Sequence, residues 1–237
     1  LQWSMVSQEI KEIKKNFSGK TPLGKRRTKI NFDTKILNFD LNFNEPSEPI
    51  TILLSRQGWI KTLKGHGHNI NDIKFKDGDE FLIYIEVISD GKSLIFSSNG
   101  KFYTVENNQL PSGRGYGDPL SSIIDLQDGD TIVSLHPYDQ NFEVLIASKK
   151  GYGFIASSKD LLSNRKAGKQ ILNLTNDDEA VGSDIINGSH VAVIGENKKM
   201  LLFAKEELPK MSKGKGVRLQ KYKEGNLTRA ISFEFDK

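Results

Sequence analysis

The chain has 237 residues, of which 27% are charged and 36% hydrophobic, an ordinary balance for one large or two modest globular domains. It contains no cysteine, which excludes disulfides and thiolate metal sites and favours a reducing compartment. No apolar stretch approaches the roughly 20 residues of a membrane span, and the N-terminal residues lack the pattern of a signal peptide.

The first 19 residues predict a helix. Apolar side chains recur there at steps of three and four, at Trp3, Val6, Ile10, Ile13 and Phe17. Gly19 is a suitable end, and residues 20–30 read as a basic linker. Residues 1–30 carry eight Lys or Arg against two Asp or Glu, a balance of +6, so the remaining residues have a balance of −2 within the net charge of +4.

A repeated hairpin follows. The runs "ITILLSRQGWIKTL", "SLIFSSNGKFYTV", "EVLIASKKGYGFIA" and "VAVIGENKKMLLFAK" each pair two apolar segments across a short polar turn. The turns are expected at Gln57-Gly58, Asn99-Gly100, Lys150-Gly151 and Asn197-Lys198. Their spacing of 42, 51 and 47 residues is typical of propeller-like blades.

Each later hairpin is preceded by a turn and a strand, and each hairpin is followed by a basic loop that contains glycine. A further strand, "KEGNLTRAISF", closes the chain with no hairpin after it, and we expect it to begin another blade. Because one such unit exposes a sheet face, the copies must pack on one another. We therefore expect residues 31–237 to form an all-β, propeller-like pinwheel of four to five blades. A ring that is open or broken, with an incomplete last blade, remains an alternative.

The basic loops suit phosphate, since lysine, arginine and bare glycine backbone all offer donors to its oxygens. If the loops follow one rim, they form a curved positive track for bent duplex DNA. The hairpin turns add further basic residues. The predicted DNA-binding residues are Arg56, Lys61, Lys64, His66, Lys101, Arg114, Lys149, Lys150, Arg165, Lys166, Lys169, Lys213, Lys215 and Arg218.

Other chemistry is less well supported. "GRGYG" lacks the strand and helix that a dinucleotide-binding motif needs. His66 and His68 could hold a metal as a pair, but a third ligand is not close in sequence. The "DGD" pairs are first of all turn sequences. No catalytic residue is assigned.

The residues resemble a known family. "EPITILLSRQGWIKTLKGH", "LPSGRGYGDPL", "DLLSNRKAGKQIL" and "LPKMSKGKGVRL" are similar, in order over about residues 26–223, to the C-terminal domain of the bacterial topoisomerase IV A subunit (ParC), in the gyrase/topoisomerase IV A-subunit family. The helix at 1–17 and "KRRTKI" resemble the segment that leads from that subunit's catalytic core.

The resemblance implies a β-pinwheel whose blades exchange strands and whose basic rim binds and bends duplex DNA. Such a domain is expected to present the DNA as the transported segment for decatenation or relaxation. It also implies that the catalytic tyrosine, and the ATP and Mg²⁺ chemistry of the partner B subunit (ParE), lie outside this chain, which would itself hold no cofactor. The expected partners are double-stranded DNA, the B subunit and the rest of the A subunit, with no membrane. The fragment is expected to be monomeric, cytoplasmic and associated with the chromosome.

The sequence departs from the family pattern at two points, and two other classes of function are alternatives. The gyrase-type first-blade heptad Gln-Arg-Arg-Gly-Gly-Lys-Gly is missing, which favours topoisomerase IV over a gyrase A-subunit domain, and only four hairpins are present where five or more blades are usual. A protein-interaction propeller with an acidic partner is the main rival. An enzyme with a site in the central channel is the weaker one.

Overall fold

The computed structural model describes residues 2–25, 28, 47–112, 115–222 and 224–235. The chain divides into two compact units, residues 1–43 and 44–237. The first contains the predicted helix, α1 (Gln2–Asn16), which has no buried residue. Its stripe from Trp3 to Phe17 is exposed in this unit. Most of the predicted linker, and the predicted start of the β domain at residue 31, lie outside the described residues.

The second unit contains four antiparallel sheets, which we number as blades 1 to 4. Blade 1 has the order β3 (Phe81–Ile88), β1 (Pro49–Ser55), β2 (Trp59–Lys64), β6 (Asp118–Pro119). Blade 2 has β7 (Ile132–Pro137), β4 (Lys92–Ser97), β5 (Lys101–Glu106), β10 (Lys169–Gln170). Blade 3 has β11 (Ala180–Ile185), β8 (Glu143–Ser148), β9 (Tyr152–Ser157), β14 (Val217–Arg218). Blade 4 has β15 (Leu227–Phe233), β12 (His190–Gly195), β13 (Met200–Ala204).

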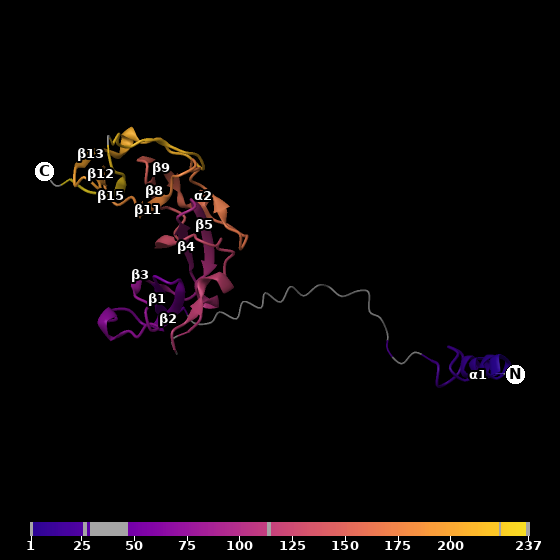
Figure 1. Ribbon diagram of the computed structural model, residues 1–237. Coiled ribbons are helices and arrows are strands. Elements are labelled where there is room, and N and C mark those ends of the chain that lie inside the picture. The colour runs from indigo at the N-terminus through magenta and orange to yellow at the C-terminus, as the bar shows by residue number, and fades with distance from the viewer. Residues whose placement is uncertain (1, 26–27, 29–46, 113–114, 223, 236–237) are drawn as a thin grey trace. The chain divides into compact units, whose positions relative to one another are not determined.

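Short helical turns connect these strands. They are η1 (Ile70–Asp72), η2 (Asn107–Gln109), η3 (Leu120–Ser122), α2 (Ser158–Leu161) and η4 (Lys205–Glu207). The four blades follow one another in an arc (Figure 1), and the prediction of an all-β pinwheel is confirmed.

Blades 1 to 3 each take their strands from three places in the chain, and the described strands of blade 4 come from two. A hairpin supplies the two middle strands, and the strand that follows it folds back as the inner strand. The outer strand comes from the segment after the next hairpin, so β6, β10 and β14 cross to the preceding blade. This arrangement corrects one expectation. The closing strand "KEGNLTRAISF" does not begin a further blade, because β15 pairs with β12 and completes the inner side of blade 4.

The hairpin turns lie where they were predicted. Gly58, Gly100, Gly151 and Lys198 have φ angles of 80°, 81°, 80° and 59° at the equivalent turn position. Positive φ is easily adopted by glycine, which explains the residue chosen in three of the four turns. Lys198 is the one non-glycine residue of the four.

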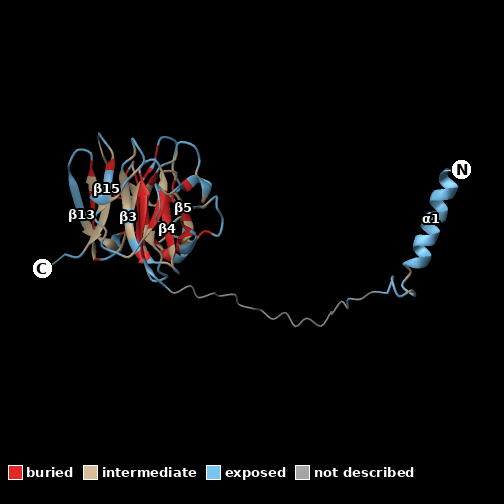
Figure 2. Cartoon of the chain, turned by 90° about the horizontal axis from the view of Figure 1, so that it is seen from below, coloured by how far each residue is buried: buried red, intermediate tan, exposed pale blue. Residues whose placement is uncertain are grey.

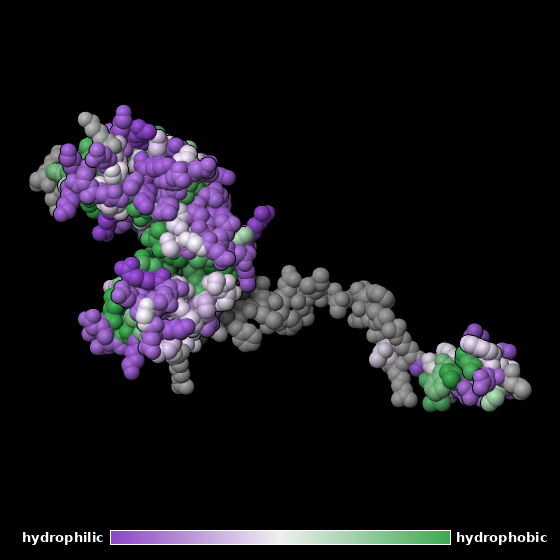
Figure 3. All heavy atoms as spheres, viewed as in Figure 1, coloured by the Kyte–Doolittle hydropathy of each residue, from purple (hydrophilic) through white to green (hydrophobic). Residues whose placement is uncertain are grey.

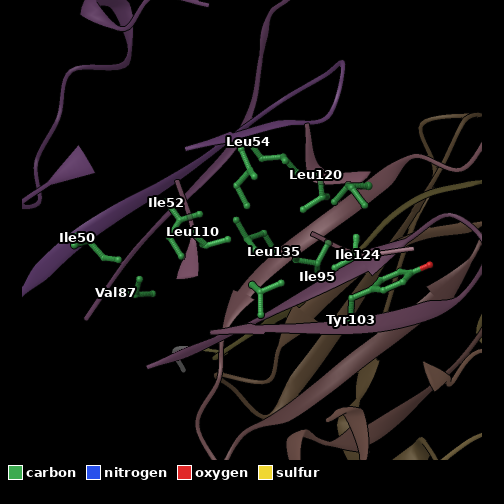
Figure 4. Close-up of a cluster of buried hydrophobic side chains, with 13 residues drawn as sticks. Ile50, Ile52, Leu54, Val87, Ile95, Tyr103, Leu110, Leu120, Ile124 and Leu135 are labelled. Atoms are coloured by element: carbon green, nitrogen blue, oxygen red, sulfur yellow. The ribbon is translucent and has the colours of Figure 1, made fainter. Parts of the chain in front are cut away.

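Apolar side chains between successive blades form three cores. The first joins blades 1 and 2 and contains Ile52, Leu54, Ile95 and Tyr103 (Figure 4). The second joins blades 2 and 3, and the third joins blades 3 and 4. Burial of one large side chain contributes about 1.5–3 kcal/mol. Among the described residues no such core joins blade 4 to blade 1, and the arc is open between them (Figure 1).

The inner strands pack side by side around the centre of the arc, β3 on β7, β7 on β11 and β11 on β15. They line a cavity of about 360 Å³. Its wall includes His136, Ser183, Asp184 and Arg229. Figure 2 shows the buried residues concentrated in the middle strands of the sheets, with exposed residues in the loops at both ends.

Candidate nucleic-acid interface

The outer side of blades 1 to 3 is covered by one connected layer of loops, which we call the outer belt. It consists of residues 111–112 and 115–125, 163–173 and 209–220. The three segments are joined by backbone hydrogen bonds. The amide of Asp125 donates to the carbonyl of Lys166 at 2.9 Å, and the amide of Asn173 donates to the carbonyl of Gly214 at 2.8 Å. The loops that the sequence placed at equivalent positions are therefore neighbours.

Positive charge in the belt is concentrated on blades 2 and 3. Residues 163–173 carry three basic side chains and residues 209–220 carry four, and neither segment has an acidic residue. Arg165, Lys166 and Lys213 are exposed. Lys210 and Lys169 have local partners, since Lys210 forms an ion pair with Glu143 and Lys169 donates to the carbonyl of Asp160 at 2.5 Å. The other five cations have no ion pair among the described residues.

Tyr152 organises two of these cations. The ammonium of Lys215 lies 3.9 Å from the centre of its ring, and the guanidinium of Arg218 lies 5.1 Å from it. Arg218 also donates to the phenol oxygen at 2.5 Å. That hydrogen bond, together with the charges of Arg218 and Lys215, lowers the pKa of Tyr152. The ring thus holds two cations together at the surface. The sequence pattern does not distinguish Tyr152 from other aromatic residues, and its position at the start of the second hairpin strand is the one local signal that could indicate it.

Lys101 belongs to the same outer side as the belt. Lys101 is half-buried at the start of β5 and pairs in register with Gln170 of the belt. Arg114 lies outside the described residues.

A second group of predicted residues lies at the hairpin turns, beside acidic residues. Arg56 pairs with Glu80 at 3.4 Å, and Lys149 pairs with Glu179 at 3.5 Å. Lys150 donates to the carbonyl of Asn176 at 3.0 Å. We call this side of the blades the turn edge. Its cations face the acidic turns that precede the inner strands, so its charge is mixed.

The prediction that the ammonium of Lys61 reaches phosphate is wrong. Only 6% of Lys61 is exposed, and its ammonium donates to the carbonyls of Lys74 at 2.9 Å and Gly115 at 3.4 Å. Burial lowers its pKa. Ile60 is fully buried, while Trp59 is half-buried with the ammonium of Lys76 4.6 Å from its ring centre.

Lys64 and His66 also differ from the expectation, because their loop is not part of the outer belt. Lys64 lies at the opposite end of β2 from the turn and pairs with Glu48 at 3.1 Å. His66 Nε2 lies 3.0 Å from the carbonyl oxygen of Val87, and His68 Nε2 lies 3.0 Å from that of Lys64. The described residues contain no group of three potential metal ligands. His66 thus connects the loop to β3, and His68 connects it to the end of β2.

The hydrophilic outer surface of the arc is visible in Figure 3, with apolar side chains gathered toward its centre. None of the helices in the described residues has the length and apolar character needed to cross a membrane.

An open arc of antiparallel sheets, three of which receive their outer strand from a later segment of the chain, is a β-propeller of the pinwheel type. The family model of the DNA gyrase C-terminal domain, a β-propeller, matches residues 94–139, 143–187 and 190–231. Each match contains one hairpin and the inner strand that follows it. The chain belongs to this family.

Within the family, curated relatives are A subunits of topoisomerase IV. The chain is 45% identical to the A subunit of DNA topoisomerase 4 from Caulobacter vibrioides over 78% of this chain and 24% of that protein. It is 36% identical to the corresponding protein of Rickettsia bellii over 95% of this chain and 31% of that protein. The chain thus spans about a quarter to a third of the length of these relatives.

Solved structures agree with the fold. The E. coli ParC C-terminal domain matches with a TM-score of 0.72 at 30% sequence identity, over 78% of this chain and 79% of that chain. A second structure, the C-terminal domain of DNA topoisomerase IV, matches with a TM-score of 0.68 at 22% identity, over 78% of this chain and 61% of that one.

Proposed function

We propose that this chain binds and bends double-stranded DNA along its outer belt, as the DNA-presenting domain of a topoisomerase IV A subunit. The observation that carries the proposal is the belt itself. Seven basic residues and no acidic one lie in its segments on blades 2 and 3, and backbone hydrogen bonds join those segments. Cations around glycine-rich backbone suit phosphate oxygens, and such contacts read no base sequence.

The curvature of the arc supports bending. A duplex that contacts both blade 2 and blade 3 has to follow the outside of the arc, and the contacts then offset the cost of deformation, which is of order 1–6 kcal/mol for a 20–30 base-pair site. In this proposal other parts of the holoenzyme carry out DNA cleavage and ATP hydrolysis. Those parts are the protein partners of this domain. The domain itself acts on the chromosome, in the cytoplasm.

The test is titration of labelled linear duplexes of about 30–40 base pairs at several salt concentrations. In the variant Lys213→Ala/Lys215→Ala/Arg218→Ala, each lost phosphate contact removes about 0.9 from the slope of log affinity against log salt. A loss of three contacts therefore reduces the slope by about 2.7 and weakens binding most at low salt.

The matched control is Arg56→Ala/Lys149→Ala/Lys150→Ala, which removes the same charge from the turn edge. We expect a much smaller change, because Arg56 and Lys149 already pair with acidic residues and the ammonium of Lys150 already donates to a backbone carbonyl. Equal losses in the two triple variants would show that only net charge matters and would contradict a belt site. Absence of DNA binding by the unaltered protein at low salt would favour an acidic protein partner instead.

A further inference from the structure

The outer edge of blade 4 differs from the other three. In blades 1 to 3 the outermost hairpin strand is covered by a two-residue strand from elsewhere in the chain. In blade 4 the outermost strand is β13, and no strand pairs with its outer edge among the described residues. Figure 2 shows β13 as an exposed strand.

Exposure of the side chains follows from this difference. Counted from the turn residue with positive φ, Leu201 takes the position that Tyr103 and Phe154 have in blades 2 and 3. Leu201 is 42% exposed, whereas Tyr103 and Phe154 are fully buried. Its neighbours Met200 and Leu202 are also exposed. Three consecutive exposed apolar residues on an open strand edge form a typical site for strand addition.

The three covered edges show what such a site binds. In each, the carbonyl of the turn glycine accepts a hydrogen bond from the backbone amide of an apolar residue. The amide of Leu120 donates to Gly58 at 2.8 Å, that of Ile171 to Gly100 at 3.1 Å, and that of Leu219 to Gly151 at 2.8 Å. In blades 1 and 3, a proline carbonyl further upstream accepts from the hairpin strand. The amide of Thr62 donates to Pro111 at 2.9 Å, and the amide of Ile155 donates to Pro209 at 3.1 Å.

A shared sequence pattern produces these bonds. The covering segments read "GDPL", "GKQI" and "GVRL", a glycine followed by two pairing residues and a buried Leu or Ile. The glycines have φ angles of 90°, 70° and 78°. A Cβ on Gly117 or Gly216 would lie 2.2 Å from a carbonyl oxygen of the covered strand. Glycine is therefore required where the segment meets the edge.

We propose that the edge of β13 binds an extended segment of a separate protein chain with the pattern Gly-x-x-Leu or Gly-x-x-Ile. The carbonyl of Lys198 and the amide of Leu202 take the places of the Gly151 carbonyl and the Ile155 amide. Met200 and Leu202 provide the apolar surface for the anchoring side chain. A second copy is not the occupant, because its own three segments of this kind are bound within its blades 1 to 3. The proposal concerns blade 4 alone and does not depend on DNA binding.

The probe is a fluorescent peptide with the sequence of residues 110–122, "LPSGRGYGDPLSS", which has one basic and one acidic residue and so limits binding by charge. We expect saturable binding measured by anisotropy. A peptide with Gly117→Val should bind at least about tenfold more weakly, equivalent to 1.4 kcal/mol. Hydrogen exchange followed by mass spectrometry should slow in residues 199–204 of the protein when the peptide binds.

Two protein variants complete the experiment. Leu202→Pro removes the outward amide, and Leu202→Lys keeps that amide but removes the apolar surface; we expect at least about tenfold weaker peptide binding for each. Thermal unfolding establishes that each variant is folded. The second variant keeps the test decisive if proline disrupts the sheet.

Several results would overturn the proposal. These are no saturable binding, equal affinity for the Gly117→Val peptide, or slower exchange outside β13 only. Protection of residues 199–204 that grows with protein concentration and needs no peptide would assign the edge to a second copy. The same protection at low concentration, in the full-length protein that contains this domain, would assign it to another part of the same polypeptide.

Discussion

A neutral histidine lies between two inner strands at the centre of the arc. His136 Nε2 is 2.8 Å from the hydroxyl oxygen of Ser183, and Asp184 and Arg229 line the same cavity. Burial lowers the pKa of His136 from 6.5 to about 4, although a hydrogen bond with the backbone of Ser183 opposes the shift. The folded protein therefore binds this proton less readily than the unfolded chain does.

This shift predicts that His136 destabilises the fold as the pH falls from 6.5 to 4. Across that window the unfolded chain binds the proton first, so the free energy of unfolding falls by up to about 3 kcal/mol. Asn in place of His136 removes the titration. Urea unfolding at a series of pH values should show that the variant loses less stability than the unaltered protein over this window. Parallel curves for the two proteins would contradict the buried neutral state.

At the scale of the element, the outer strands contribute both to the stability of the fold and to the position of the cations in the proposed DNA-binding site. The covering segment of blade 3 reaches β9 through Gly216, whose φ is 78°. A Cβ there would lie 2.2 Å from the carbonyl oxygen of Gly153. We predict that Gly216→Ala costs about 2–4 kcal/mol of unfolding free energy, from backbone strain and the clash together. It should also weaken DNA binding, because Lys215 and Arg218 flank the displaced residue.

Gly182→Ala is the control for this prediction. An added Cβ at Gly182 meets nothing within 4 Å, and its φ is not in the positive range. Thermal melting and DNA titration of both variants check the expectation. A Gly216→Ala protein that melts with the unaltered protein would show that the outer strand tolerates a shift.

The elements also show which parts of the fold the sequence could predict. The turns at Gly58, Gly100 and Gly151 are local features, since each depends on a few adjacent residues and on positive φ. The crossing of β6, β10 and β14 to the preceding blade depends on contacts between distant segments, which hairpin periodicity alone does not contain. Only the family resemblance supplied the strand exchange. For the same reason the closing strand was placed in the wrong blade.

The site was predictable to a similar degree. The composition of the loops around Arg165 and Lys213 indicated a basic surface correctly. It could not show that Lys61, with the same charge, would have its ammonium bound by two carbonyls. Nor could it separate Arg56, which faces Glu80, from the cations of the belt. Burial and ion pairing are decided by the tertiary packing, which places residues far apart in sequence side by side.

For the whole molecule, the arrangement of the blades predicts how DNA binding and bending are divided. The five cations without an ion pair among the described residues are distributed over blades 2 and 3, and the outer belt joins the two blades. A duplex that contacts all five should show a salt slope of about −4.5. Arg165→Ala/Lys166→Ala on blade 2 should bring the slope to about −2.7, with the contacts on blade 3 retained.

Bending should respond differently from affinity, because it needs contacts at two places along the arc. The blade 2 variant still holds DNA on blade 3, so at saturating protein the duplex stays bound but straightens. Energy transfer between dyes at the two ends of a duplex of about 40 base pairs measures this directly, and we expect lower transfer in the saturated variant than in the unaltered complex. An unchanged bend together with the reduced salt slope would mean that the duplex is bent without contacts to blade 2. The proposed path of DNA along the belt would then be wrong.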